Sequence, residues 1–501
     1  MKIYLRKSLL LIAAAVALAS CDADISGSLD KDGDPGTADF STFVALGDSL
    51  TAGFADNALY RHGQENSYPA IMAQQFALAG GGIFEQPLMP VGATGSMTLT
   101  GIGDLGLADR LMLVATGNPD SPAAPGTIIP TQSTSIDVPL IGPFNNMGVA
   151  GAKSYHLGAN TYGNPAALPN ANPYYIRFAS STAATMVGDA AIQVPTFFIL
   201  WIGNNDVLSY ATSGGSGVQG AGPPPYGAND ITDPAFFPAI YGGILGALNT
   251  PTNKGVLINI PDVTTIPFFT TVPYNAIPLD AATAAALNAT LAAGFNAYLD
   301  AVAGIIGADE VARRRLAYSS GQNPVLIVDE TLTDLSGLPG FPAALTGLEF
   351  ARQATADDYI VLPTSTKLGT EAVPGNPAST WGVSNPLVDA DVLTAAEVAI
   401  VEAARNPFNV AIKAAADADP NLLLFDAEAK LTELNDTGIL YGSGGITSEF
   451  ATGGGFSLDG VHPTARGYAV IANEIFKVIN AGFDAYIPPV DPSDFTTVFY
   501  Q

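Results

Sequence analysis

The chain has few of the residues that cross-link a fold or bind nucleic acid. Its 501 residues include one cysteine, Cys21, which excludes an intramolecular disulfide and the Cys/His clusters that hold structural zinc. Only 19 residues are Lys or Arg, against 46 that are Asp or Glu, so the formal net charge is -27. A phosphate backbone repels such a chain, and we therefore exclude nucleic acid as a partner.

Charged residues make up only 13% of the chain, whereas hydrophobic residues make up 48%. This composition predicts a globular body with a large core, and the 53 glycines and 37 prolines indicate long loops. The apolar run at residues 9–18 is too short to span a bilayer as a stable helix. Because basic residues precede this run, it predicts a signal peptide over residues 1–20.

The segment Leu18-Ala19-Ser20-Cys21 ends the apolar run and resembles the lipobox of bacterial lipoproteins. The resemblance implies that the Cys21 thiol is acylated and that Cys21 becomes the first residue of the exported protein. A lone buried cysteine is the alternative, but it does not suit the end of a signal sequence. We therefore expect a lipid anchor in the bacterial cell envelope, at the outer membrane, with membrane contact through lipid and not through charge.

The rest of the chain divides into a linker, a large domain and a tail. Residues 21–41 are rich in Asp, Gly and Ser and predict a flexible linker behind the lipid anchor. Residues 42–482 are expected to form one domain, followed by a C-terminal tail at 483–501. Three stretches fit neither the helical nor the strand period and predict insertions, at about 80–140, 213–230 and 337–388.

Apolar runs and helical patterns alternate along this domain. The runs that predict buried strands lie at 43–46, 197–202, 256–260, 325–328 and 422–425. Between them, apolar residues recur at helical spacing from 287 to 306, behind Asp280 as N-cap, and again from 468 to 479. This alternation predicts an α/β fold with a mostly parallel central sheet.

A serine follows the first of these strands directly, in Gly47-Asp48-Ser49-Leu50. A serine hydroxyl attacks a substrate only when a base takes its proton and nearby donors receive the developing oxyanion. The chain has three histidines, and one lies in Asp459-Gly460-Val461-His462, where the short spacing lets the carboxylate fold back onto the imidazole. The sequence thus predicts Ser49 as nucleophile, His462 as base and Asp459 as the acid that orients it.

Other polar residues near these motifs are interpreted as structural. His62 lies just past the helix expected after Ser49, and His156 has no acid nearby, so both are expected to lie in loops or on the surface. Asp48 and Asp206 stand in tight turns from strand to helix, where a carboxylate more often caps backbone N–H groups than moves protons.

Two segments could supply the oxyanion donors. The segment 146–151 ends in Gly151, whose backbone N–H can approach a substrate closely because no β-carbon obstructs it. The segment Gly203-Asn204-Asn205-Asp206 follows a strongly apolar strand, so Asn205 should emerge at the carboxyl end of the sheet, where sites of open α/β folds collect.

These four segments together resemble the conserved blocks of the SGNH hydrolases, also called GDSL lipases and esterases, and they occur in the family's order. The resemblance implies a three-layer α/β/α fold with a flavodoxin-like sheet. It also implies an oxyanion hole made by the Ser49 N–H, the Gly151 N–H and Asn205.

The function that this resemblance implies is hydrolysis of a carboxylic ester through an acyl-enzyme, with a lipid or another acylated molecule as substrate and no cofactor or metal. Two alternatives stay open: an acetylesterase that acts on acetylated glycans, and a surface lipoprotein that binds lipid or glycan without catalysis. Substrate choice is expected to lie in the insertions.

The lipid anchor can be tested by metabolic labelling with a fatty acid. We expect label on the wild-type protein and none on Cys21→Ala, because the acyl chains are attached through this residue. Equal labelling of both proteins would contradict the lipoprotein assignment.

Overall fold

The computed structural model describes most of the chain outside the N-terminal segment. The signal peptide, Cys21 and the larger part of the expected linker lie outside the described residues, so their assignments stay predictions. The described residues are 33–118, 121–129, 131–376, 378–442 and 444–500.

A five-stranded parallel sheet forms the centre of the molecule, in the order β16-β9-β8-β1-β7. Its strands are β1 (Phe43–Gly47), β7 (Asn146–Gly148), β8 (Phe197–Trp201), β9 (Lys254–Ile258) and β16 (Leu422–Phe425). Taken in chain order, these strands follow the 2-1-3-4-5 arrangement of doubly wound sheets, whose order reverses between β1 and β8. The predicted α/β class with a mostly parallel sheet is confirmed.

Helices cover both faces of the sheet, because alternate strand residues point to opposite apolar clusters. Phe197, Ile199 and Trp201 of β8 pack towards α4 (Tyr68–Ala77) and α15 (Ala465–Phe483). Phe198 and Leu200 pack towards the other side, where three helices lie: α6 (Met186–Ala191), α8 (Phe237–Leu248) and α13 (Ala395–Asp417). Because both faces of these strands are buried, the strands are continuously apolar. Four of the five could therefore be predicted from the sequence.

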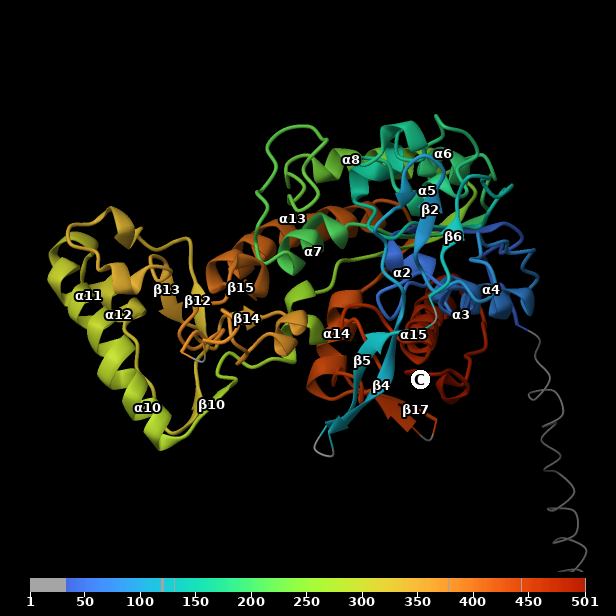
Figure 1. Ribbon diagram of the computed structural model, residues 1–501. Coiled ribbons are helices and arrows are strands. Elements are labelled where there is room, and N and C mark those ends of the chain that lie inside the picture. The colour runs from blue at the N-terminus through green and yellow to red at the C-terminus, as the bar shows by residue number, and fades with distance from the viewer. Residues whose placement is uncertain (1–32, 119–120, 130, 377, 443, 501) are drawn as a thin grey trace, which may run out of the picture.

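One predicted strand, at 325–328, is not part of this sheet. The segment forms β12 (Leu326–Val328), which pairs antiparallel with β13 (Ala351–Gln353) in a separate lobe. Figure 1 shows this lobe projecting from one side of the body, with apolar clusters of its own. The prediction was wrong because an apolar run reveals burial but not which core the run enters.

The lobe spans the chain between α9 (Pro267–Thr270) and α13, and so extends well beyond the insertion predicted at 337–388. The helix predicted behind Asp280 lies in it, and the Asp280 carboxylate accepts the Thr283 N–H at 2.6 Å. The remaining elements of the lobe are β10 (Ile277–Leu279), α10 (Ala281–Leu287), α11 (Ala293–Ile306), α12 (Ala308–Arg314), β11 (Gly321–Asn323), β14 (Tyr359–Ile360) and β15 (Val392–Leu393).

The continuous helix Ala281–Ile306 is the one described helix that is long and apolar enough to cross a membrane, by length and composition alone. Phe295, Leu299 and Val302 on this helix are buried in the core of the lobe. One side of the helix is therefore used for packing within the protein.

The insertion at 80–140 carries small sheets, and the insertion at 213–230 forms a loop of turns. Elements of the first insertion are β2 (Met97–Leu99), β3 (Gly103–Asp104), β4 (Leu111–Asn118), β5 (Ser121–Thr127) and β6 (Thr134–Ser135). Short elements complete the body: α2 (Ser49–Ala52), α3 (Arg61–Glu65), α5 (Pro173–Ile176), α7 (Asn205–Thr212), α14 (Ala427–Asp436), β17 (Ile439–Tyr441) and β18 (Gly444–Ile446).

Both ends of the described chain pack onto the body, which corrects the linker and tail predictions. Within the expected linker, Phe40 is 1% exposed and stacks on Phe76 with ring centroids 4.0 Å apart. In the expected tail, Ile487 is buried, and Phe499 lies under the Arg110 guanidinium at 4.4 Å. In the linker, polar composition around the one aromatic residue, Phe40, concealed its contact with Phe76.

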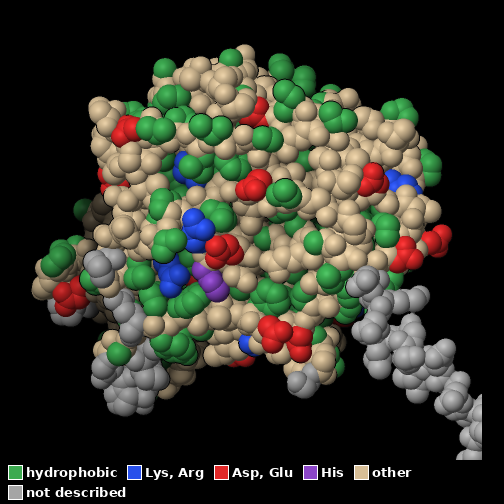
Figure 2. Space-filling model, turned by 90° about the vertical axis from the view of Figure 1, so that its right-hand side faces the viewer, with side chains coloured by type: hydrophobic (Ala, Val, Ile, Leu, Met, Phe, Trp, Pro, Cys, Tyr) green, Lys and Arg blue, Asp and Glu red, His purple; other side chains and the backbone are tan. Residues whose placement is uncertain are grey.

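Basic side chains are few on the described surface. Figure 2 shows one face on which Lys and Arg side chains are sparse and hydrophobic side chains lie singly or in small groups. One basic side chain, Arg352, is engaged within the lobe, where it pairs with Asp329 and Asp358.

Candidate active site

The serine of the first motif stands at a sharp turn from strand to helix. Ser49 is the first residue of α2, directly after β1 and the N-cap residue Asp48, whose carboxylate accepts the Leu50 N–H at 3.0 Å. The predicted capping role of Asp48 is thus confirmed. On the neighbouring strand, a β-carbon at Gly148 would lie 2.2 Å from the Ala52 nitrogen, so only glycine lets α2 pack this closely against β7.

Ser49, His462 and Asp459 lie in one hydrogen-bonded row, although the first two are 413 positions apart in the chain. Ser49 Oγ lies 2.9 Å from His462 Nε2, and His462 Nδ1 lies 2.9 Å from Asp459 Oδ2. The Ser49 residue is 6% exposed, and the His462 side chain is 13% exposed. The row is thus enclosed, and the imidazole is more exposed than the serine.

The Asp459 carboxylate is held ionised by its surroundings. Burial alone would raise its pKa, but the neighbouring His462 and several hydrogen bonds outweigh burial and lower the pKa of Asp459 to about 2. Its Oδ1 accepts the backbone N–H groups of Val461 and His462, each at 2.8 Å. Because an ionised carboxylate only accepts, His462 must carry its proton on Nδ1, which leaves Nε2 free to accept the Ser49 proton.

A second carboxylate, Asp56, fixes the loop that carries Asp459. Its oxygens accept the Leu458 N–H at 3.1 Å and the Tyr60 hydroxyl at 2.7 Å, and its own N–H donates to Ser457 Oγ at 2.9 Å. The next residue, Asn57, donates its N–H to Asp459 Oδ2 at 2.9 Å.

Sequence reasoning did not predict these hydrogen bonds of Asp56 and Asn57. Their only sequence signal is the Asp56-Asn57 pair, since these residue types tolerate the left-handed backbone that both adopt, with φ of 52° and 65°. Burial raises the pKa of Asp56 to about 6.

The loop of Asp459 and His462 also touches the base of the lobe. Gly460 has φ of 71°, and a β-carbon there would lie 2.9 Å from the Phe268 nitrogen. The Phe268 N–H donates to the Gly460 carbonyl at 2.9 Å, and the Phe54 ring lies 4.7 Å from the imidazole ring of His462. Only glycine allows this close backbone contact.

The predicted oxyanion donors emerge from the strands on either side of β1. Gly151 follows β7 and Asn205 opens α7 after β8, so both lie at the same edge of the sheet as Ser49. The Asn205 amide donates one N–H to the Ala152 carbonyl at 3.0 Å, which fixes its orientation and leaves its second N–H available. Gly151 is exposed, and a β-carbon there would have one neighbour within 4 Å, Asn172 Nδ2 at 3.9 Å.

Two buried carboxylates connect these turns. Asp48 Oδ2 accepts the Asn204 amide at 2.9 Å and so joins the turn after β1 to the turn after β8. Burial raises the pKa of Asp48 to about 6, although this hydrogen bond and that from Leu50 oppose the shift. Asp206 accepts the backbone N–H and the hydroxyl of Ser154, at 2.8 and 2.6 Å, and so caps a different segment from its own.

The other two histidines lie outside this row. His62 lies 3.0 Å from Thr496 Oγ1 and packs against Phe499 near the C-terminus. His156 accepts the Lys153 N–H at 3.0 Å and stacks on Tyr162, and burial lowers the pKa of His156 to about 3. Both contacts are structural, but both histidines are partly buried and lie in helical turns, where the sequence predicts loop or surface positions.

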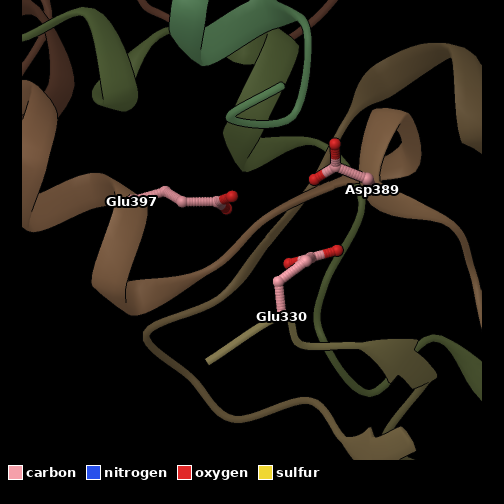
Figure 3. A group of neighbouring side chains, drawn as sticks. All are labelled: Glu330, Asp389 and Glu397. Atoms are coloured by element: carbon pink, nitrogen blue, oxygen red, sulfur yellow. The ribbon is translucent and has the colours of Figure 1, made fainter. Parts of the chain in front are cut away.

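Three carboxylates gather in the described structure where the lobe returns to the body. Figure 3 shows Glu330, Asp389 and Glu397 around one space, and their nearest oxygens all lie within 4.8 Å of one another. Burial and mutual repulsion raise the pKa of Asp389 to about 6 and that of Glu397 to about 7. Glu397 accepts the N–H and hydroxyl of Thr394 as the capping box of α13, so we assign the group a structural role.

Comparisons of the chain with protein-family models, with curated proteins and with solved structures found no match. The function must therefore be inferred from the four sequence blocks and from the geometry of the residues that they bring together.

The raised pKa of Asp48 predicts a pH-dependent stability. The folded protein holds this proton up to about pH 6, whereas the unfolded chain loses it near the ordinary value of 3.8, so stability falls as the pH rises through this window. Between pH 4 and pH 8, wild type should lose about 2 kcal/mol relative to Asp48→Asn, which cannot ionise. Urea unfolding of both proteins measures the difference, with exposed Asp436→Asn as control. Parallel pH curves for wild type and Asp48→Asn would contradict the prediction.

Proposed function

We propose that this protein is a serine hydrolase of the SGNH type that cleaves carboxylic esters at the cell envelope. The observation that carries the proposal is the row Ser49–His462–Asp459, with 2.9 Å at both links. The 2-1-3-4-5 strand order and the four ordered blocks support the same family assignment.

The proposed first half-reaction acylates Ser49. His462 Nε2 takes the Ser49 proton while Oγ forms a bond to the ester carbon. The carbon–alkoxide bond then breaks, and the alcohol leaves with the proton from Nε2. Asp459 stays ionised throughout and stabilises the imidazolium. In the second half-reaction, water gives a proton to Nε2 as its oxygen bonds to the acyl carbon. The bond from that carbon to Ser49 Oγ then breaks, Oγ takes the proton back from Nε2, and the acid is released.

The oxyanion of both half-reactions is assigned to three neutral donors: the Ser49 N–H, the Gly151 N–H and the Asn205 amide. Donors of this kind are worth about 3–4 kcal/mol each when they are fixed before the reaction. The hydrogen bond from Asn205 to Ala152 supports the assignment, because it holds the amide in place without using both N–H groups.

Two other functions remain as outcomes of the test. An acetylesterase would cleave acetyl groups from glycans with the same residues, and a binding lipoprotein would keep the fold without turnover. The proposed partners are the ester substrate and, through lipid on Cys21, the outer membrane. No step of the proposed reaction requires a metal or an organic cofactor.

A series of chromogenic esters with acyl chains of increasing length tests the proposal. We expect wild type to hydrolyse them and both Ser49→Ala and His462→Ala to lose at least about 1000-fold in kcat/KM, because each removes a group that acts in the reaction. Asp459→Asn should also lose activity strongly, because an amide cannot hold the His462 proton on Nδ1 or stabilise the imidazolium. The control is Ser336→Ala, which changes an exposed serine in the lobe.

If Ser49→Ala hydrolyses the whole series as fast as wild type, the proposal of a serine hydrolase fails. The result would then favour the alternative of a lipoprotein that binds lipid or glycan without catalysis. Activity confined to acetate would favour the acetylesterase.

A further inference from the structure

A small apolar pocket lies beside the proposed nucleophile and base, and the reaction described above does not use it. Its volume is about 120 Å³. Three of its lining residues are chain neighbours of the reacting pair: Leu50 follows Ser49, and Val461 and Pro463 flank His462. The pocket therefore lies next to the turns that carry Ser49 and His462.

Apolar side chains from both the sheet and the C-terminal elements form the walls. Trp201 of β8, Leu434 of α14, Ile446 of β18 and Val470 of α15 are each less than 9% exposed. The one charged residue in the described lining is Lys430, whose ammonium group pairs with Glu433 and Glu474 at 2.8 and 3.0 Å. A polar ligand would find little to bind here, whereas a hydrocarbon chain would displace water at a favourable free energy.

The volume limits the length of such a chain. Dry apolar cavities of about 150 Å³ accept a molecule the size of benzene, so this pocket suits roughly four to six carbons. An acetyl group would leave it largely empty, and a long fatty acyl chain would have to extend past it.

We propose that this pocket binds the acyl chain of the substrate, and that the enzyme prefers esters of short to medium acids, from butanoate to hexanoate. The assignment rests on the proposed ester hydrolysis. The acyl group, and not the alcohol, is placed here because it stays bonded to Ser49 in both half-reactions, and Leu50 is the next residue in the chain.

The first test compares two ester series on the full chain. Over an acyl series from acetate to dodecanoate, kcat/KM should rise about fourfold per added methylene up to hexanoate and then level or fall, as each buried methylene contributes about 0.8 kcal/mol. Acetates of increasingly long alcohols should show no such rise. A rise in the alcohol series alone would overturn the assignment of the acyl chain.

Substitutions in the wall of the pocket should change the preferred length of the acyl chain. Leu434→Ala enlarges the pocket and should shift the optimum towards longer acyl chains, whereas Val470→Phe fills it and should lower the hexanoate-to-acetate ratio of kcat/KM at least fivefold. Leu440→Ala is the matched control, because Leu440 is 86% exposed and does not line the pocket. Unchanged chain-length profiles in folded Leu434→Ala and Val470→Phe would contradict the proposal.

A binding measurement separates this inference from the proposed function. The chain has two tryptophans, Trp201 and Trp381, so Trp381→Phe leaves Trp201 in the pocket wall as the only one. In Ser49→Ala/Trp381→Phe, hexanoate should change the Trp201 fluorescence and acetate should not. If hexanoate binds but no ester is cleaved, the proposed function fails and the pocket assignment stands. If short esters are cleaved through Ser49 but hexanoate leaves Trp201 unchanged, the pocket assignment fails and the function stands.

Discussion

The pairing of β1 between β7 and β8 is the constraint on which the rest of the site depends. Parallel strands end at the same edge of a sheet, so this pairing brings the turns with Ser49, Gly151 and Asn205 to one place. Gly148 and the buried carboxylate of Asp48 then fix the distances between these turns, the first by allowing close packing and the second by bonding Asn204. Burial of Asp48 in this position raises its pKa to about 6.

The histidine loop is positioned by different means. It comes from the far end of the chain, and its hydrogen bonds with Asp56 and Asn57 attach it to the segment just after α2. The contact of Gly460 with Phe268 joins it to the base of the lobe. The loop is thus held by the body and by the short helix α9 that precedes the lobe.

Much of the sheet and the whole row of reacting groups could be predicted from the sequence. Buried parallel strands are continuously apolar, and the short spacing of Asp459 and His462 limits where the carboxylate can point. The short edge strand β7 and the lobe could not be predicted, because apolar runs such as 325–328 do not reveal which core they enter. The hydrogen bond between Asp56 and Ser457 joins residues 401 positions apart, and no local sequence pattern predicts such a contact.

The central claim is that Ser49 is a nucleophile activated by His462. It is tested most directly by reaction with a fluorophosphonate, which bonds covalently to a serine only when a neighbouring base activates it. The account predicts a single adduct, located by mass spectrometry on the peptide that contains Ser49 and lost in His462→Ala. An unmodified wild-type protein, or an adduct on another serine, would contradict it.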